Sequence, residues 1–302
     1  MRHLTRIAGL GLTVVCLSMT VTAQPSDGAG TIIPLYPDGA PTSLGVPEIR
    51  GVDPMNGGLL IRNVSEPTLE LFRPAAGHAN GTTVIVVPGG GFVGLSYEAV
   101  GTAVARRLVE HGVTAFVLKH RTIRSGPDLM PMPEVHADEM AALVERIQTG
   151  LPVEIPPFAG EAHAVEDGAR AMRIVRERAE EWGVDPERVG IVGFSSGAFL
   201  AADLAIGDTP TRPDFVALLY GGLRTPVPAD ASPAFIAGAA DDEMLPHDPV
   251  QLYTAWRKAG ADAELHVYEH GGHGFDLAPR GTTSDQWFDG LVLWMRSRDL
   301  VE

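Results

Sequence analysis

The chain has 302 residues, of which 45% are hydrophobic and 20% are charged, so it can bury a sizeable core. Its formal net charge of −15 is spread along the chain rather than gathered in one run. Such a surface repels nucleic acid and anionic lipid, which argues against a polyanionic partner and leaves the oligomeric state open.

The N-terminus has the pattern of a signal peptide. Arg2 and Arg6 precede the short apolar stretch Ile7–Met19, and the run Val21-Thr22-Ala23 supplies the small residues that signal peptidase reads. The stretch is too short for a stable membrane span, although an uncleaved anchor helix is the alternative. We therefore expect residues 1–23 to be removed, and residues 24–302 to form one domain, free of the membrane and secreted or periplasmic.

Cysteine usage is consistent with export. Cys16 is the only cysteine, and it lies inside the expected signal peptide. The mature chain would then contain neither a disulfide nor a thiol nucleophile. A core of this size can form without disulfides even in an oxidising compartment.

Beyond a Pro/Gly-rich stretch, Gln24–Gly58, that is predicted to wrap the surface, short β-branched runs alternate with helical patterns. Several runs are continuously apolar, as in strands covered on both faces of a largely parallel sheet. We expect strands at Thr68–Phe72, Thr83–Val87, Thr114–Leu118, Val189–Val192, Phe215–Leu219, Ala234–Ala237 and Glu264–Tyr268, and helices at Tyr97–His111, Ala164–Trp182, Gly197–Ala205, Pro249–Ala259 and Ser284–Arg298. The alternation predicts an α/β fold with a doubly wound, mostly parallel sheet that binds ligands at the carboxyl ends of its strands.

Three glycines follow an early strand in the run Pro88-Gly89-Gly90-Gly91-Phe92. Glycines at this place expose backbone N–H groups to a developing negative charge, so Gly90 and Gly91 are candidate oxyanion-hole donors. A phosphate-binding loop would need Lys and Ser or Thr next, and a dinucleotide site would need wider glycine spacing and a downstream acid. A plain turn is the remaining alternative.

The segment Arg121–Ala162 interrupts the alternation. It carries many prolines and one amphipathic pattern, Pro133–Gln148, which predicts a helix. Its position suits a short cap over the rim of a site at the sheet edge, and an ordinary surface loop is an equal alternative.

The run Gly193-Phe194-Ser195-Ser196-Gly197 is the centre of the functional interpretation. A serine hydroxyl becomes a useful nucleophile when a sharp strand-to-helix turn holds it exposed beside a base, and such a turn needs glycines where side chains would clash. A five-residue match alone is weak, but here a strand pattern precedes it and a helix pattern follows. Only Ser195 has glycine two residues away on both sides, so we assign it as nucleophile in preference to Ser196. The Ser196 amide is then a further oxyanion-hole donor.

The acid and the base are expected after the nucleophile, in the chain order Ser, Asp, His that this kind of turn accompanies. The strand Ala234–Ala237 leads to Asp241-Asp242-Glu243, and the spacing alone does not separate the two aspartates. Glu243 is a third option for the acid, and the aspartate that is not used would be a turn-capping residue. The strand Glu264–Tyr268 leads to a glycine-rich loop in which His273 lies deeper than His270, so His273 is the preferred base. The other histidines form no short-spaced set, are interpreted as surface or structural, and predict no metal site.

With these residues the chain resembles bacterial acetylxylan-esterase and feruloyl-esterase-like α/β-hydrolases, which are relatives of the acetyl esterases related to hormone-sensitive lipase. The resemblance covers nearly all of residues 24–302 and is carried by Pro34–Pro37, Gly39–Pro41, Pro67–Leu69, Val87–Phe92, Phe116–Arg121, Trp182–Pro186, Gly193–Gly197, Arg212–Phe215, Asp241–Pro246 and His273–Phe275. In that family the acid opens an Asp-x-x-hydrophobic-Pro run, which falls on Asp242 with Leu245 and Pro246. The resemblance thus implies a triad of Ser195, Asp242 and His273.

The resemblance further implies a metal-free and cofactor-free hydrolase acting on a small-molecule or polysaccharide ester, with acetyl groups on carbohydrate favoured. The chain departs from the family at Ala198-Phe199, where Gly-His is usual, and at His120, where Tyr is usual, so acyl and sugar specificity stay open.

One alternative is a peptidase of the prolyl-oligopeptidase type, although the sequence has no counterpart of the propeller that those enzymes usually carry. The other is a catalytically silent binding protein on the same fold.

Overall fold

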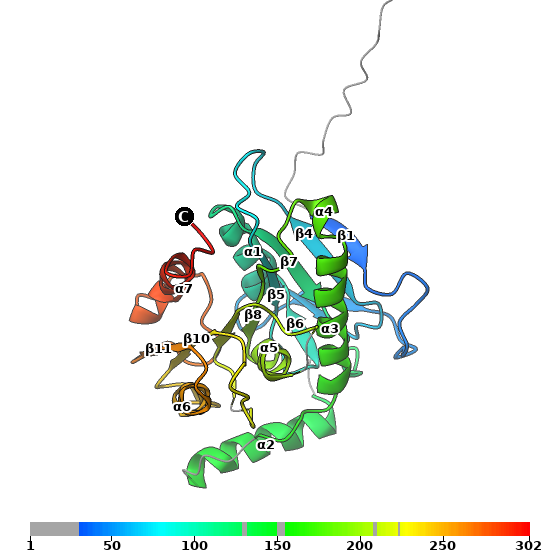
Figure 1. Cartoon of the computed structure of the whole chain (residues 1–302). Coiled ribbons are helices and arrows are strands. Elements are labelled where there is room, and N and C mark those ends of the chain that lie inside the picture. The colour runs from blue at the N-terminus through cyan, green and yellow to red at the C-terminus, as the bar shows by residue number, and fades with distance from the viewer. Residues whose placement is uncertain (1–29, 129–131, 150–154, 208–209, 223) are drawn as a thin grey trace, which may run out of the picture.

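The computed structural model describes residues 30–302 except 129–131, 150–154, 208–209 and 223 (Figure 1). The expected signal peptide therefore lies outside the described residues. The strands are β1 (Thr31–Pro34), β2 (Ile49–Val52), β3 (Leu59–Arg62), β4 (Thr68–Phe72), β5 (Thr83–Val87), β6 (Gly94–Ser96), β7 (Thr114–Lys119), β8 (Val189–Phe194), β9 (Val216–Leu219), β10 (Ala234–Ala239) and β11 (Ala263–Tyr268). The helices are the π-helix η1 (Glu98–Thr102), α1 (Ala103–Val109), α2 (Glu134–Thr149), α3 (Glu161–Glu177), α4 (Ala179–Trp182), α5 (Ser196–Ile206), α6 (Asp248–Ala259), the 3-10 helix η2 (Thr283–Gln286) and α7 (Trp287–Arg296).

The main sheet has the order β1-β4-β7-β5-β8-β9-β10-β11. The strands from β7 to β11 along this order are parallel, whereas β4 runs antiparallel to both of its neighbours. This arrangement confirms the predicted doubly wound, mostly parallel α/β sheet. The carboxyl ends of β5, β8, β10 and β11 therefore lie along one edge, where the side chains that follow them can meet.

The central strands are buried on both faces because helices cover each side of the sheet (Figure 1). Ile85 and Ile191 belong to a hydrophobic cluster with residues of α3, α5 and α6. Val84 and Val86, which point to the opposite face, belong to a second cluster with residues of α1 and α7. Strands that must fill two cores have no polar face, which explains the continuous apolar runs in the sequence.

The strands that the sequence did not predict are the short ones. Thr68–Phe72 and Thr83–Val87 have the predicted bounds, but β1 forms inside the stretch that was expected only to wrap the surface. β1 pairs antiparallel with β4 at the sheet margin, and most of its side chains are exposed. A small antiparallel sheet, β2-β3-β6, was likewise not predicted. Strands of three or four half-exposed residues give too little alternation for a pattern to stand out.

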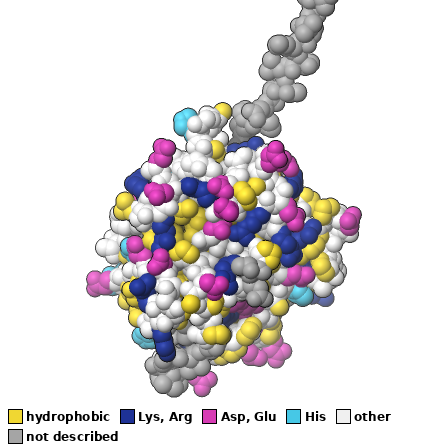
Figure 2. Space-filling view, in the orientation of Figure 1, with side chains coloured by type: hydrophobic (Ala, Val, Ile, Leu, Met, Phe, Trp, Pro, Cys, Tyr) yellow, Lys and Arg dark blue, Asp and Glu magenta, His cyan; other side chains and the backbone are white. Residues whose placement is uncertain are grey.

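On the face of the molecule shown in Figure 2, acidic and basic side chains are interspersed rather than segregated. No helix within the described ranges is long and apolar enough to cross a membrane.

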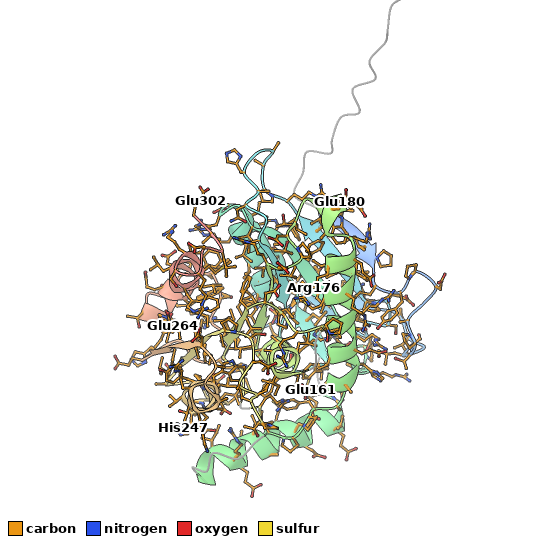
Figure 3. The ribbon with its side chains drawn as sticks, in the orientation of Figure 1. Glu161, Arg176, Glu180, His247, Glu264 and Glu302 are labelled. Atoms are coloured by element: carbon orange, nitrogen blue, oxygen red, sulfur yellow. The ribbon has the colours of Figure 1, made fainter. Side chains whose placement is uncertain are left out.

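The helix predicted at Pro133–Gln148 forms as α2. It lies across one end of the molecule, next to α3, α5 and α6 (Figure 1). Glu161, at the start of α3, and His247, just before α6, lie above opposite ends of α2 (Figure 3). The Arg146 side chain of α2 makes two hydrogen bonds, of 2.9 and 2.6 Å, to the buried carboxylate of Asp248 at the start of α6. The predicted cap segment thus includes a helix that is docked on the body.

Candidate active site

Ser195 occupies a sharp turn between β8 and α5. Its backbone has φ 51° and ψ −120°, a conformation that residues other than glycine rarely adopt and that is typical of strained functional positions. A side chain on Gly193 would overlap the carbonyl of Gly197, and one on Gly197 would overlap the carbonyl of Val87. Both glycines are therefore required for this turn to pack against β5 and α5.

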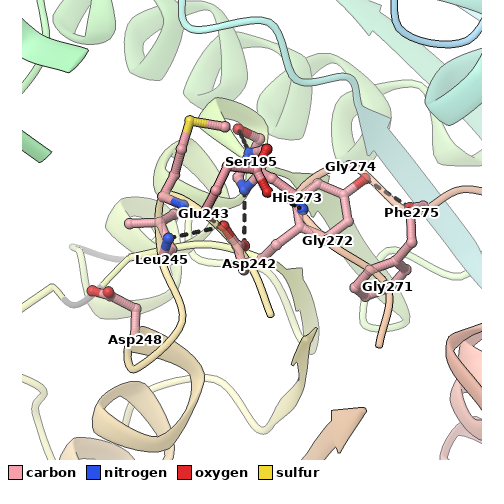
Figure 4. Close-up of polar contacts among 12 residues, drawn as sticks. Ser195, Asp242, Glu243, Leu245, Asp248, Gly271, Gly272, His273, Gly274 and Phe275 are labelled. Atoms are coloured by element: carbon pink, nitrogen blue, oxygen red, sulfur yellow. Dashed lines mark hydrogen bonds and ion pairs between the residues drawn. The ribbon is translucent and has the colours of Figure 1, made fainter. Parts of the chain in front are cut away.

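Ser195, His273 and Asp242 form a hydrogen-bonded chain (Figure 4). The Ser195 Oγ lies 2.8 Å from His273 Nε2, and His273 Nδ1 lies 2.9 Å from Asp242 Oδ2. His273 and Asp242 are both buried. The other carboxylate oxygen of Asp242 accepts the amides of Met244 and Leu245 at 2.8 and 2.9 Å, which fixes its orientation. A Ser–His–Asp chain of this kind activates a hydroxyl for acyl transfer.

The structure separates the acids that the sequence left open. Asp241 is partly exposed and points to the histidine loop, where its carboxylate accepts the amides of Gly271 and Gly272 at 2.9 and 2.8 Å. These bonds, that from Gly272 above all, hold the pKa of Asp241 below its usual range. Asp241 therefore caps the loop that carries His273. Glu243 also supports this loop, since its Oε2 accepts the His273 amide at 3.2 Å.

Tyr220, which the sequence analysis did not select, lies against the histidine. Its ring meets that of His273 edge to face, with centroids 5.0 Å apart. The hydroxyl donates a hydrogen bond to the carbonyl of Phe275 at 3.0 Å. Burial raises the pKa of Tyr220 well above its usual value, so the hydroxyl stays protonated as a donor. The only signal in the sequence is an aromatic residue at the end of a strand beside the nucleophile strand.

The glycine loop after β5 lies directly against the Ser195 turn. A side chain on Gly89 would come within 2.9 Å of the Ser195 Cβ. Gly90 and Gly91 have φ of 139° and 62°, so the loop adopts conformations that favour glycine. Within the described part of the chain, the amides of Gly90, Gly91 and Ser196 donate to no protein acceptor. Three N–H groups beside a nucleophile are thus available to a ligand.

Metal-ligating side chains do not gather anywhere among the described residues: no group of three or more His, Cys, Asp or Glu side chains is placed to hold a metal ion. His270, the alternative base, lies 3.2 Å from Asp241 on the surface and makes no contact with Ser195.

The profile of the dienelactone hydrolase family matches residues 74–286, a span that includes the glycine loop, the Ser195 turn and His273. The chain belongs to the dienelactone hydrolase family.

The chain is also similar to two curated proteins over about 70% of its length. It is 26% identical over 254 residues to an acetylxylan esterase of Xylanibacter ruminicola, an alignment that covers 72% of this chain and 46% of that protein. It is 23% identical over 250 residues to endo-1,4-beta-xylanase B of Butyrivibrio fibrisolvens, covering 68% of this chain and 34% of that one. The chain thus spans less than half the length of these curated relatives.

Solved structures agree on the fold. An acetyl ester-xyloside bifunctional hydrolase from Caldicellulosiruptor lactoaceticus superposes with a TM-score of 0.62 at 23% identity, covering 90% of this chain and 98% of that one. Esterase 2 from Thermogutta terrifontis, with butyrate bound, superposes with a TM-score of 0.59 at 18% identity, covering 79% of this chain and 91% of that one. These neighbours confirm the α/β-hydrolase fold that the resemblance implied.

Proposed function

We propose that the protein is a serine carboxylic-ester hydrolase that removes acetyl or other short acyl groups from carbohydrate. The observation that carries the proposal is the Ser195 Oγ at 2.8 Å from His273 Nε2 on a strained strand-to-helix turn. A hydroxyl held in this way needs only an acyl carbonyl within reach to act as a nucleophile.

The reaction proceeds in two acyl-transfer steps. His273 takes the proton of Ser195 as the oxygen attacks the ester carbonyl, and Asp242 stabilises the imidazolium that forms. The amides of Gly90, Gly91 and Ser196 stabilise the tetrahedral oxyanion, each donor contributing about 3 kcal/mol in the transition state. His273 then protonates the departing alcohol, and water, activated by the same imidazole, releases the acid. No metal or organic cofactor takes part, because the protein groups supply nucleophile, base and oxyanion stabilisation.

The carbohydrate substrate is supported by the relatives rather than by the geometry. An acetylxylan esterase and a xylanase are similar in sequence, and an acetyl ester-xyloside hydrolase is similar in fold. All three names concern xylan or xylosides, and two of them concern acetyl esters. We therefore place an acetylated xylan or a small acetylated sugar first among the substrates.

A labelling experiment tests the chemistry. A fluorophosphonate probe should label the protein covalently, and Ser195→Ala should abolish labelling and lower kcat for p-nitrophenyl acetate by at least about 10⁴-fold. Ser196→Ala is the matched control, because it removes the neighbouring hydroxyl, leaves the amide in place and should still be labelled. A protein that is never labelled would instead be a silent binding protein.

Product analysis then tests the substrate class. Acetylated xylan, feruloyl esters and short p-nitrophenyl esters should be compared with peptide substrates of a prolyl oligopeptidase. Acetate release from acetylated xylan with higher kcat/KM than from p-nitrophenyl acetate supports the carbohydrate substrate. Peptide cleavage without ester hydrolysis would contradict it.

We further propose that the chain is exported, with residues 1–23 as its signal peptide and residues 24–302 as one domain. The supporting features are the two arginines, the short apolar stretch and the small residues before Gln24.

A further inference from the structure

A histidine far from the triad in sequence lies against the oxyanion loop. His136, on α2, is buried, and its ring fills the space that a side chain at position 91 would occupy. A Cβ on Gly91 would lie 2.9 Å from Nε2 and 3.3 Å from Nδ1 of this ring, and closer still to Cε1. From the sequence, His136 belongs to the histidines interpreted as surface or structural. The structure instead packs it on one of the expected oxyanion-hole donors.

The His136 ring lies on the buried face of α2. His136 and Leu143 lie on the face of α2 that is buried against the body, as their spacing of seven residues allows. Within the described residues, His136 Nδ1 and Glu139 Oε2 are buried without any hydrogen-bond partner, and they face each other at 3.6 Å. The other oxygen of Glu139 accepts the amide of Ala159 at 2.6 Å, which ties this turn of the helix to the end of the cap segment.

The two ends of α2 contact segments that follow two different strands of the main sheet, β5 and β10. The first turn carries His136 onto the loop of Gly91. The last turns carry Arg146 onto Asp248, which follows the loop of Asp242 by a few residues. Figure 1 shows the helix spanning this end of the molecule. A rigid helix anchored at both ends fixes the position of the His136 ring relative to the triad.

The loop under the ring needs such support. Gly91 has φ of 62°, and three successive glycines leave this backbone many conformations. An oxyanion hole works only if its N–H groups already point at the place where charge develops, because reorganising them during the reaction costs activation energy. A ring in the side-chain space of Gly91 restricts that freedom by direct contact. Burial lowers the pKa of His136.

We propose that His136 is a positioning residue of the oxyanion hole, whose ring holds the Gly91 amide in the direction required for catalysis. This inference rests on the proposed function, because it concerns the same reaction. It assigns to the helix of the cap segment a part in catalysis that is independent of substrate entry.

Steady-state kinetics on p-nitrophenyl acetate test the proposal. His136→Ala should lower kcat about 10-fold with KM nearly unchanged, since the support acts on a transition-state interaction. His136→Gln, which has a similar volume, should recover most of that loss. Leu143→Ala is the matched control on the same face of α2: it should lower Tm at least as much as His136→Ala while kcat stays within about two-fold of wild type below the melting range.

A double-mutant cycle tests the contact itself. Gly91→Ala should lower kcat about 100-fold because the new methyl group meets the ring and strains the loop. In the His136→Ala background that collision is absent, so the same Gly91→Ala change should cost several-fold less. Additive effects in the cycle would overturn the proposal, as would a His136→Ala enzyme with wild-type kcat and only a lower Tm.

The result that would refute the proposed function differs from the result that would refute only the role of His136. If the wild-type protein hydrolyses no ester and Ser195 is not labelled by a fluorophosphonate, the hydrolase assignment and the positioning role are both overturned. If the wild type is active and labelled while the His136 variants match it in kcat, only the positioning role is overturned.

Discussion

Three consecutive acids after β10 each accept hydrogen bonds from His273 or from the loop that carries it. Asp242 binds the imidazole, Glu243 accepts the His273 amide, and Asp241 accepts the amides of two loop glycines. Only the first of these contacts touches a group that changes charge during the reaction. The other two hold the backbone that carries the ring, so their loss should affect position and stability rather than chemistry.

Substitution of the two aspartates separates these roles. Asp242→Asn should lower kcat for p-nitrophenyl acetate by about 10³–10⁴-fold, because an amide cannot stabilise the imidazolium and favours the wrong tautomer. Asp241→Asn keeps an oxygen acceptor for the loop amides, so kcat should fall less than about 10-fold while Tm falls by a few degrees. Comparable losses in kcat for both variants would contradict the assignment of Asp242.

Some residues of the site could be predicted from the sequence, and others could not. Ser195 and the glycines were predictable because a strand-to-helix turn of this kind demands fixed residue types at fixed spacing. His273 was predictable from the chain order of the triad and its depth in the last loop, and the structure places it against Ser195. Asp242 could be chosen over Asp241 only through the family resemblance. Tyr220 and His136 act by packing across long sequence separations, and side-chain packing between distant elements leaves no local pattern.

At the level of elements, strands were predictable where burial is complete. β5 and β8 fill two cores and consist of apolar or small residues throughout, whereas β1 and β2 are short and mostly exposed. Tertiary pairing stabilises these marginal strands, so their own residues need not favour the extended state. The predicted helix Tyr97–His111 begins as the π-helix η1. Hydrophobic periodicity does not resolve such a local departure.

A buried charge cluster joins α3 and α5. The Arg224 guanidinium bonds to Glu161 at the start of α3 and, at 3.1 Å, to Asp203 on α5, and it stacks over the Phe199 ring at 4.5 Å. Two carboxylates thus share one cation, with Arg224 and Glu161 buried and Asp203 partly exposed. Burial, together with the negative charge of Glu161, raises the pKa of Asp203 to about 7.

This cluster predicts a pH dependence of stability. Because the pKa of Asp203 is higher in the folded than in the unfolded chain, the folded protein binds more protons between about pH 4 and pH 7. Stability should therefore fall as pH rises through this window and become independent of this group above it. Asp203→Asn should flatten the fall by roughly 1 kcal/mol, or about 2–4 °C in Tm between pH 5 and pH 8.

Thermal unfolding at a series of pH values measures this effect. Asp138→Asn, which removes a carboxylate from the exposed face of α2, is the control for the loss of one negative charge. A wild-type Tm that rises between pH 5 and pH 7, and loses that rise in Asp203→Asn, would show that attraction to Arg224 outweighs burial and would refute the prediction.

On the scale of the whole molecule, the net charge depends on whether the N-terminal segment is removed. The chain carries a formal net charge of −15, and removal of residues 1–23 would take away Arg2 and Arg6 without taking any acid. The mature protein would then be more acidic than the full chain, a property that favours solubility at high concentration outside the cell.

Export is testable by the mass of the secreted product. When residues 1–302 are expressed in a bacterium, the protein outside the cytoplasm should begin at Gln24, because signal peptidase cuts after small residues such as Ala23. Ala23→Phe should block this cleavage, whereas Cys16→Ser should leave it unchanged. A full-length chain that stays with the membrane fraction would favour the uncleaved anchor instead.

The strand order places Ser195 and His273 after strands that differ in how well they are supported by neighbouring strands. Ser195 follows β8, which is flanked on both sides and wholly buried. His273 follows β11, a half-exposed strand that, among the described residues, pairs with β10 alone. Warming frays the margin of a sheet before its centre. We therefore expect heating to separate the imidazole from the serine hydroxyl below the temperature of global unfolding, so that activity is lost first and returns on cooling.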